Sequence, residues 1–240
     1  MSIALLALTA LLTALLSGVF GMAGGMILMG VYAALLPVAS AMVLHGGTQL
    51  IANGSRAFLL WRDVYWRSFL FYVVGALGAF AALSRTHYLP SPLVGFLGLG
   101  LSPFAARLLP ARHFDFERPA AALWCGVQVA SVQLLAGAAG PLLDIAFVNT
   151  RLTRTQVVAT KAVSQVFSHT LKLLYFIPLA SRGAIGPALA CSVLCTTLLG
   201  TRLGTQLLQR MSDRDFRRYS RYIVYATGCV YLAKAGALLL

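Results

Sequence analysis

The amino-acid sequence predicts an all-α integral membrane protein organised as two inverted repeats, each a glycine-broken hairpin plus three transmembrane helices. Composition is the first indication: 59% of the 240 residues are apolar, 10% are charged, and the mean hydropathy is +0.82. The others are a series of long apolar runs, two of them interrupted by glycine, and the distribution of loop arginines. A water-soluble domain with an ordinary charged surface is excluded.

Eight apolar runs, bounded by charge or proline, account for nearly the whole chain. At roughly 20 apolar residues per helical crossing, the length provides about eight to ten membrane segments and leaves no soluble catalytic domain. We expect the first run to remain in the mature protein, because no basic region precedes it. In chain order the runs are 3–36, 38–60, 68–84, 90–109, 119–149, 155–177, 184–208 and 219–239.

Two of these runs are too long for one crossing, and glycine interrupts both near the middle. The first break reads Ser17-Gly-Val-Phe-Gly-Met-Ala-Gly-Gly25, and the second reads Ala136-Gly-Ala-Ala-Gly-Pro141. Each interrupted run is therefore predicted to be a broken helix or a hairpin, and a hairpin is either re-entrant or fully crossing.

Loop arginines distinguish these geometries. If each interrupted run crosses once, six loop arginines lie on one side of the membrane and eight on the other, which is no bias. If each run enters and returns, twelve share one face and only Arg85 and Arg182 lie on the other, as the positive-inside rule requires. We therefore expect two hairpins in a multi-pass protein of the bacterial inner (plasma) membrane, with the twelve-arginine face cytoplasmic and both termini outside.

This geometry makes the two halves inverted repeats. Residues 1–109 form the first repeat, 110–118 a cytoplasmic linker and 119–240 the second repeat. Residues 47–56 (GTQLIANGSR) resemble residues 159–168 (ATKAVSQVFS), and each segment follows its own glycine break. Paired breaks in two inverted halves indicate a central transport site.

Polar side chains inside a membrane are costly and usually mark a path or a site. Run 155–177 carries a helical stripe of them from Lys161 to Lys172, and run 38–60 carries a corresponding stripe from His45 to Arg56. Asp144 is the one acidic residue within an apolar run. The excess of cations and amides over acids favours an anionic ligand, as do half-helix N-termini freed by the glycine breaks.

We expect backbone amides at the breaks and polar side chains downstream of them to hold the anion, with Lys161 supplying positive charge. The predicted substrate-binding residues are Gly21, Gly24, Gly25, Thr48, Gln49, Asn53, Gly137, Gly140, Thr160, Lys161 and Gln165. Proton coupling is assigned to His45, Asp144 and His169. We expect no catalytic residue, metal site or cofactor, and the four cysteines are predicted to be buried in apolar segments without disulfides.

Structural explanations compete with these assignments. A hydrogen bond to a neighbouring helix explains either histidine equally well, and snorkelling to an interface explains Arg56 and Lys172. For Lys161 the alternative to a role in the site is an ion pair with Asp144. The glycine clusters also suit close helix packing, although both interrupt over-long runs at equivalent places.

At these residues the chain resembles the sulfite exporter TauE/SafE family of membrane permeases. The resemblance rests on the glycine-rich residues 17–26, Pro37 and His45-Gly-Gly-Thr-Gln49, repeated as Gly137-Ala-Ala-Gly-Pro141 and Val158-Ala-Thr-Lys161. It spans essentially the whole chain. It implies export or uptake of sulfite, sulfonates or related small anions, coupled to the proton gradient.

The leading functional prediction is therefore a secondary transporter and not an enzyme. We expect it to export a small anion, such as sulfite, a sulfonate or a related organic anion, by proton-coupled alternating access. Its expected partners are that anion and the lipid bilayer, with a homodimer as one option. Nucleic acid is not expected, because the basic excess of +13 lies in short loops. A passive anion channel, a structural subunit of a larger transporter and, less favoured, a membrane-embedded transferase are the alternatives.

Overall fold

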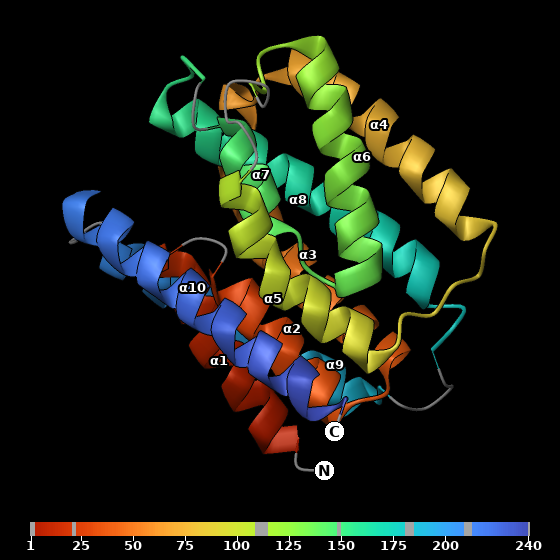
Figure 1. The fold of residues 1–240 in the computed structure, drawn as a ribbon. Helices are drawn as coiled ribbons and strands as arrows, with labels where there is room; N and C mark the ends of the chain where they lie inside the picture. Colours follow the sequence, from red (N-terminus) through yellow and green to blue (C-terminus); the bar gives the residue numbers. More distant parts are fainter. Residues whose placement is uncertain are drawn as a thin grey trace.

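The computed structural model describes residues 3–20, 23–108, 115–147, 150–180, 185–208 and 213–239, and all its regular elements within these ranges are helices. The predicted all-α class is confirmed. The first half contains α1 (Ile3–Phe20), α2 (Ala23–Leu35), α3 (Val38–Leu59), the 3₁₀ turn η1 (Trp61–Asp63), α4 (Trp66–Ser84) and α5 (Pro92–Leu108) (Figure 1). The second half contains α6 (Pro119–Ala136), α7 (Gly140–Phe147), α8 (Arg154–Phe176), α9 (Pro187–Leu208) and α10 (Asp213–Ala237). Each uninterrupted apolar run corresponds to one helix, and each interrupted run to two.

Local sequence signals set several of the helix ends. Pro37 is the N-cap of α3, and Pro119 is the first residue of α6, where its missing N–H would have no partner in any case. Thr153 begins α8 with a capping box: its hydroxyl accepts from the Gln156 N–H, and its own N–H donates to the Gln156 side chain at 3.0 Å.

The helices match a membrane environment in length and surface. Three of them, α4, α6 and α9, are long and apolar enough to cross a bilayer, while α1, α2 and α5 carry shorter apolar stretches. Outward-facing side chains of α4, such as Leu70 and Val74, are large, apolar and exposed. In a protein that spans a bilayer, such side chains face lipid acyl chains instead of water.

The cysteines match the prediction only in part. All four are free, and Cys125 is buried as predicted. Cys191, Cys195 and Cys229 are instead exposed, because they lie on outward-facing sides of α9 and α10. An apolar sequence context therefore did not distinguish the core from the lipid-facing surface.

The end of the second interrupted run lies against its beginning. The Phe116 N–H donates to the Ala146 carbonyl at 2.9 Å, and the Arg151 N–H donates to the Glu117 carboxylate at 2.6 Å. These bonds join the start of α6 to the end of α7 and beyond. With eight residues, α7 is about 12 Å long, well short of the roughly 30 Å hydrocarbon core. It is thus a short returning arm; α2, with 13 residues, is about 20 Å long by the same rise per residue.

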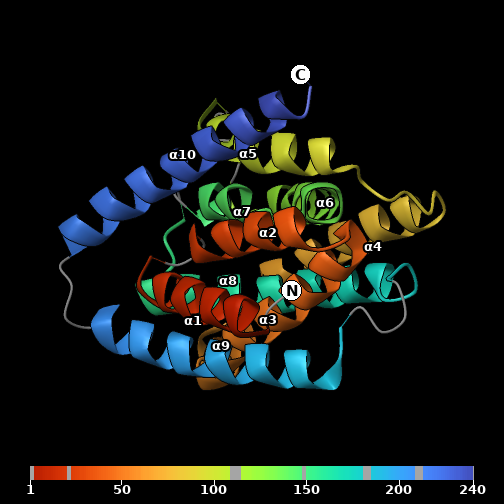
Figure 2. The ribbon, with the colours of Figure 1, turned by 90° about the horizontal axis from the view of Figure 1, so that it is seen from below.

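Four helix pairs organise the packing. Helix α1 packs against α9, α4 against α6, α3 against α8, and α5 against α10. Figure 2 shows α5 and α10 along one edge, α9 along the opposite edge, and α2 and α7 between them. Close crossings occur at glycine: a Cβ on Gly75 would lie 2.0 Å from the Leu123 carbonyl oxygen, and one on Gly204 2.3 Å from that of Leu15. Small residues allow this approach in membrane proteins.

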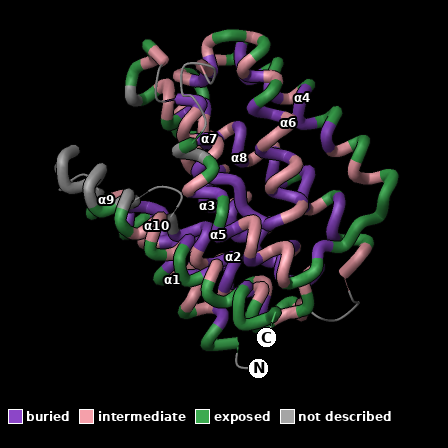
Figure 3. Tube along the Cα trace, in the orientation of Figure 1, coloured by how far each residue is buried: buried purple, intermediate pink, exposed green. Residues whose placement is uncertain are grey.

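The described residues on either side of the first glycine break, and those of the second, are mostly buried. Buried residues follow α3, α7 and α8 through the middle of Figure 3. One apolar cluster includes α2 and α3, and a second joins α4, α6 and α7. Among the polar side chains buried with them are His45, Gln49, Asn53, Gln165 and His169, which places the two polar stripes of the sequence inside the bundle.

Candidate functional site

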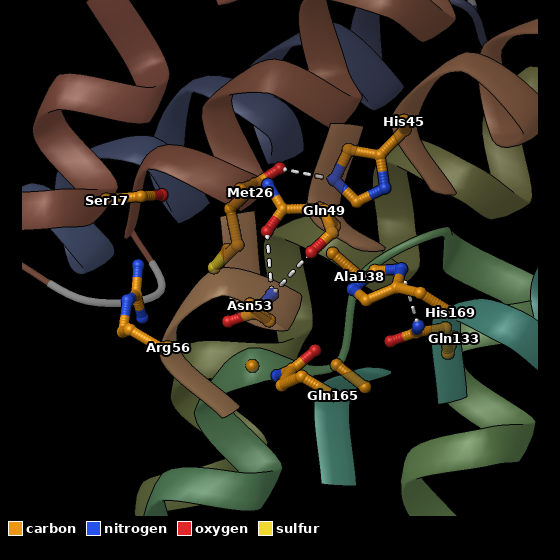
Figure 4. Close-up of a pocket in the computed structure, with 13 residues that line it drawn as sticks. Ser17, Met26, His45, Gln49, Asn53, Arg56, Gln133, Ala138, Gln165 and His169 are labelled. Carbon is orange, nitrogen blue, oxygen red and sulfur yellow. Dashed lines mark hydrogen bonds between the residues drawn. The ribbon is translucent and has the colours of Figure 1, made fainter. Parts of the chain in front are cut away.

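A small cavity lies between the two glycine breaks. Six helices contribute to its walls: α1, α2, α3, α6, α7 and α8. Its volume is about 30 Å³, enough for one or two water-sized groups in this conformation. The lining residues, most of them labelled in Figure 4, are Ser17, Gly25, Met26, His45, Gln49, Asn53, Arg56, Gln133, Ala138, Ala139, Gly140, Gln165 and His169.

Two helix N-termini border this cavity. Gly25 and Met26 lie in the first turn of α2, and Ala138, Ala139 and Gly140 lead into the first turn of α7. N–H groups in the first turn of a helix have no intrahelical acceptor, and the helix dipole adds partial positive charge there. Both breaks therefore present a backbone environment that suits negative charge.

Amide side chains form much of the remaining polar lining. Asn53 donates to the Gln49 backbone carbonyl at 3.0 Å and to its side-chain oxygen at 3.3 Å, so these two residues act as a unit (Figure 4). Gln133 bonds through Nε2 to His169 Nδ1 at 3.0 Å, while its buried Oε1 has no partner among the described residues. Gln165 completes the set from α8.

Arg56 is the charged residue of the lining. No Asp or Glu is among the residues that line the cavity, and the half-buried Arg56 guanidinium forms no ion pair with any residue that the structure describes. Its place near the end of α3 follows from the helical stripe that also contains Gln49 and Asn53. An uncompensated guanidinium beside a cavity is a ligand for anions, because its donors match oxyanion geometry.

Two histidines form another part of the wall. The rings of His45 and His169 have centroids 5.4 Å apart. His45 Nε2 donates to the Gly25 carbonyl at 2.9 Å, and its Nδ1 lies 2.9 Å from the Nζ of Lys172. Lys172 is itself completely buried behind this wall, so it does not snorkel to an interface.

Seven of the residues predicted from sequence meet at this cavity. Gly25, Gln49, Asn53, Gly140 and Gln165 come from the predicted binding set, and His45 and His169 from the proton-coupling set. Gly21 lies outside the described residues. Gly24 does not line the cavity: it packs against α1, where a Cβ would lie 2.0 Å from the Thr13 carbonyl oxygen.

The structure places the remaining predicted residues elsewhere. The Thr48 hydroxyl donates to the Leu44 carbonyl at 2.7 Å, and the Thr160 hydroxyl accepts from the Tyr65 N–H at 2.9 Å. Gly137 does not line the cavity; it ends α6 with a positive φ of 88°, and its carbonyl accepts from Lys172 at 2.8 Å. Lys161 and Asp144 form an ion pair between α8 and α7 and are absent from the cavity lining.

Sequence reasoning left six lining residues out of the site: Ser17, Met26, Arg56, Gln133, Ala138 and Ala139. Two of them carried a usable signal. Gln133 is a polar residue in an apolar run, one turn before the second break, and Arg56 ends the α3 stripe. The alanines and Met26 carry none, because they contribute through their position at the breaks.

Comparison with known proteins agrees with these features. A family model described as Sulfite exporter TauE/SafE matches residues 6–231, which is nearly the whole chain. The resemblance seen at the glycine breaks is thereby confirmed. No curated protein and no solved structure matched the chain.

Proposed function

The chain belongs to the sulfite exporter TauE/SafE family, and we propose that this membrane permease carries a small oxyanion through the cavity between its two glycine breaks. Sulfite or a small sulfonate is the proposed substrate class, and export from the cytoplasm is the proposed direction.

The observation that carries the proposal is the charge of the cavity lining. It combines the Arg56 guanidinium, two helix N-termini and the amides of Gln49, Asn53, Gln133 and Gln165, and no Asp or Glu is among the lining residues that the structure describes. Cation transport would ordinarily require carboxylates or a cluster of carbonyl oxygens aimed at the ion. Donors and positive charge instead complement an anion that accepts hydrogen bonds from several directions.

The small volume favours a small solute. About 30 Å³ holds one or two water-sized groups, so a large organic anion would require substantial movement of the walls. Sulfite and the sulfonate group present three oxygens that accept hydrogen bonds from an arginine fork and from amide N–H groups. The cavity lining includes an arginine, side-chain amides and residues of two first helical turns.

The helix pairing supports an inverted-repeat organisation with alternating access. If α1–α5 correspond to α6–α10, the α1·α9 contact corresponds to α6·α4, while α3·α8 and α5·α10 correspond to themselves. Helices α3 and α8 also run antiparallel, since His45 meets Lys172 while Tyr65, just beyond α3, meets Thr160. We propose that movement of one half against the other opens the cavity to each side in turn.

His169 is the proposed coupling group at the cavity, because its ring lines the cavity and histidine is a common proton carrier in proteins. His45 also lines the cavity, but both of its ring nitrogens are hydrogen-bonded, to the Gly25 carbonyl and to Lys172, which leaves no open position for a proton. Asp144 stays a candidate by sequence alone, and its pairing with Lys161 separates it from the cavity lining. A histidine that lines the cavity would exchange its proton next to the bound anion, so no further residues are needed to connect the proton site to the substrate site.

A flux assay on purified protein in liposomes tests the proposal. Sulfite, methanesulfonate and acetate are compared with and without an imposed pH gradient. We expect sulfite or methanesulfonate to accumulate against its own gradient when a pH gradient is present. Equilibration without accumulation would indicate the passive channel, and no flux of any of these anions would contradict the proposed function.

A further inference from the structure

Lys172 lies behind the cavity wall with its amino group completely buried. It belongs to α8, three residues after His169, and its side chain has no exposed surface. It forms no ion pair with an acidic residue in the described part of the chain. A charged group held this way inside a membrane protein is expensive and usually functional.

The hydrogen bonds of Lys172 connect the two glycine breaks. Its Nζ donates to the Gly137 carbonyl at 2.8 Å and to His45 Nδ1 at 2.9 Å, and it lies 3.5 Å from the sulfur of Met29. His45 in turn bonds to the Gly25 carbonyl at 2.9 Å. One continuous chain of hydrogen bonds thus runs from the end of α6 to the first turn of α2.

These hydrogen bonds fix the tautomer of His45. A carbonyl oxygen only accepts hydrogen bonds, so the His45 nitrogen facing Gly25 must carry the proton. The other nitrogen, Nδ1, therefore has a free lone pair and accepts from the Lys172 ammonium. The ring is held as a neutral imidazole. Its Nδ1, which faces away from Gly25, is in contact with the Lys172 amine.

The ammonium is balanced by dipoles, not by a carboxylate. The Gly137 carbonyl ends α6, where helix carbonyls carry partial negative charge. Three acceptors surround Nζ, namely the Gly137 carbonyl, His45 Nδ1 and the Met29 sulfur, and this number matches the three donors of a protonated amine. Neutral acceptors of this kind do not cancel the net charge of an ammonium. That charge therefore acts on the cavity lined by His45 across a single imidazole ring in a low-dielectric interior.

We propose that Lys172 is a positioning residue that sets the charge preference of the cavity, favouring anions with more negative charge through its contact with His45. This inference rests on the proposed function, because it assumes an anion beside His45. If Lys172 only linked the two breaks through hydrogen bonds, it would stabilise the fold but would not discriminate between anions of different charge.

The test compares Lys172→Met with Lys234→Met, a matched change at an exposed lysine of α10. The probes are thiosulfate, which carries two negative charges at neutral pH, and methanesulfonate, which carries one. Binding is measured from the concentration-dependent rise in the melting temperature of the purified protein, and transport from liposome flux. For Lys172→Met we expect affinity for thiosulfate to fall at least about tenfold, and affinity for methanesulfonate to fall several times less.

Several outcomes separate the explanations. Unchanged affinity for both probes in Lys172→Met, or an equal loss for both, would overturn the inference. A selective loss in Lys234→Met would overturn it as well, because the effect would then follow total protein charge. If the unmodified protein binds and transports none of the anions, the proposed function itself has failed. Lys172→Gln, which retains neutral donors for Gly137 and His45, gives the same comparison if Lys172→Met does not fold.

Discussion

Lys161 and Asp144 form an ion pair that joins α8 to α7 outside the cavity lining, with 25% of the lysine side chain and 47% of the aspartate side chain exposed. Each charge is therefore compensated by the other. Arg56, in contrast, borders the cavity without an ion-pair partner among the described residues. Arg56, and not Lys161, is the basic residue among the described residues that line the cavity.

Replacing Arg56 with Gln should raise the KM for sulfite at least about tenfold, because a charge-assisted hydrogen bond contributes roughly 1.5–3 kcal/mol. Lys161→Gln removes a partly exposed ion pair, so we expect a KM change of less than about fivefold, the equivalent of at most about 1 kcal/mol. Flux in liposomes measures both, with Arg85→Gln in an exposed turn as the control. The opposite ranking would restore Lys161 as the charged ligand.

Replacing His169 with Gln should leave anion flux measurable but remove its response to an imposed pH gradient. His169 accepts from Gln133 through Nδ1, so in the neutral ring Nε2 carries the proton, and this N–H forms no hydrogen bond with a described residue. A second proton would enter at Nδ1 when its bond to Gln133 is released, and we propose that this exchange couples the ring to the pH gradient. The measurement is the ratio of flux with and without the gradient. His87→Gln, at an exposed turn, is the control, and an unchanged ratio in His169→Gln would exclude this histidine from coupling.

Gly75 and Gly78 provide a matched pair on α4. A Cβ at Gly75 would lie 2.0 Å from the Leu123 carbonyl oxygen of α6, whereas one at Gly78 meets nothing within 4 Å. Gly75→Ala should destabilise the protein by about 1–3 kcal/mol through overpacking of this crossing. Gly78→Ala should be neutral or slightly stabilising, since alanine favours helix. The melting temperatures of the two variants in detergent test this difference. Equal values would contradict the close α4–α6 contact.

Cysteine labelling tests the hairpin geometry. Two returning hairpins place Arg62 and Arg151 on the same face, whereas single crossings place them on opposite faces. We expect Arg62→Cys and Arg151→Cys, in a background with serine at the exposed native cysteines, to resist an impermeant maleimide added to intact cells. Ser91→Cys should react from outside. Labelling of only one of the two arginine positions from outside would contradict the predicted topology.

Local and periodic features of the sequence were sufficient for the all-helical class, the helix boundaries and the family. Hydropathy runs and proline positions depend on neighbouring residues alone, so the runs matched the helices to within a few residues, except that α10 begins at Asp213, six residues before the predicted run 219–239. The glycine breaks were equally visible, because a run too long for one crossing must be interrupted. The polar stripes of α3 and α8 indicated a buried site for the same reason: helical periodicity is a local property.

Which members of those stripes face the cavity depended on packing between distant segments. The rotation of α8 against α7 pairs Lys161 with Asp144, and the approach of α3 to α8 and of α6 to the first hairpin buries Lys172 against His45 and Gly137. The sequence by itself determined that this is a helical permease with two glycine-interrupted runs and an excess of cations and amides over acids in its apolar segments. Only the tertiary structure decided which cation is compensated and which is free, because a charge is neutralised by its neighbours in space and not by its neighbours in the chain.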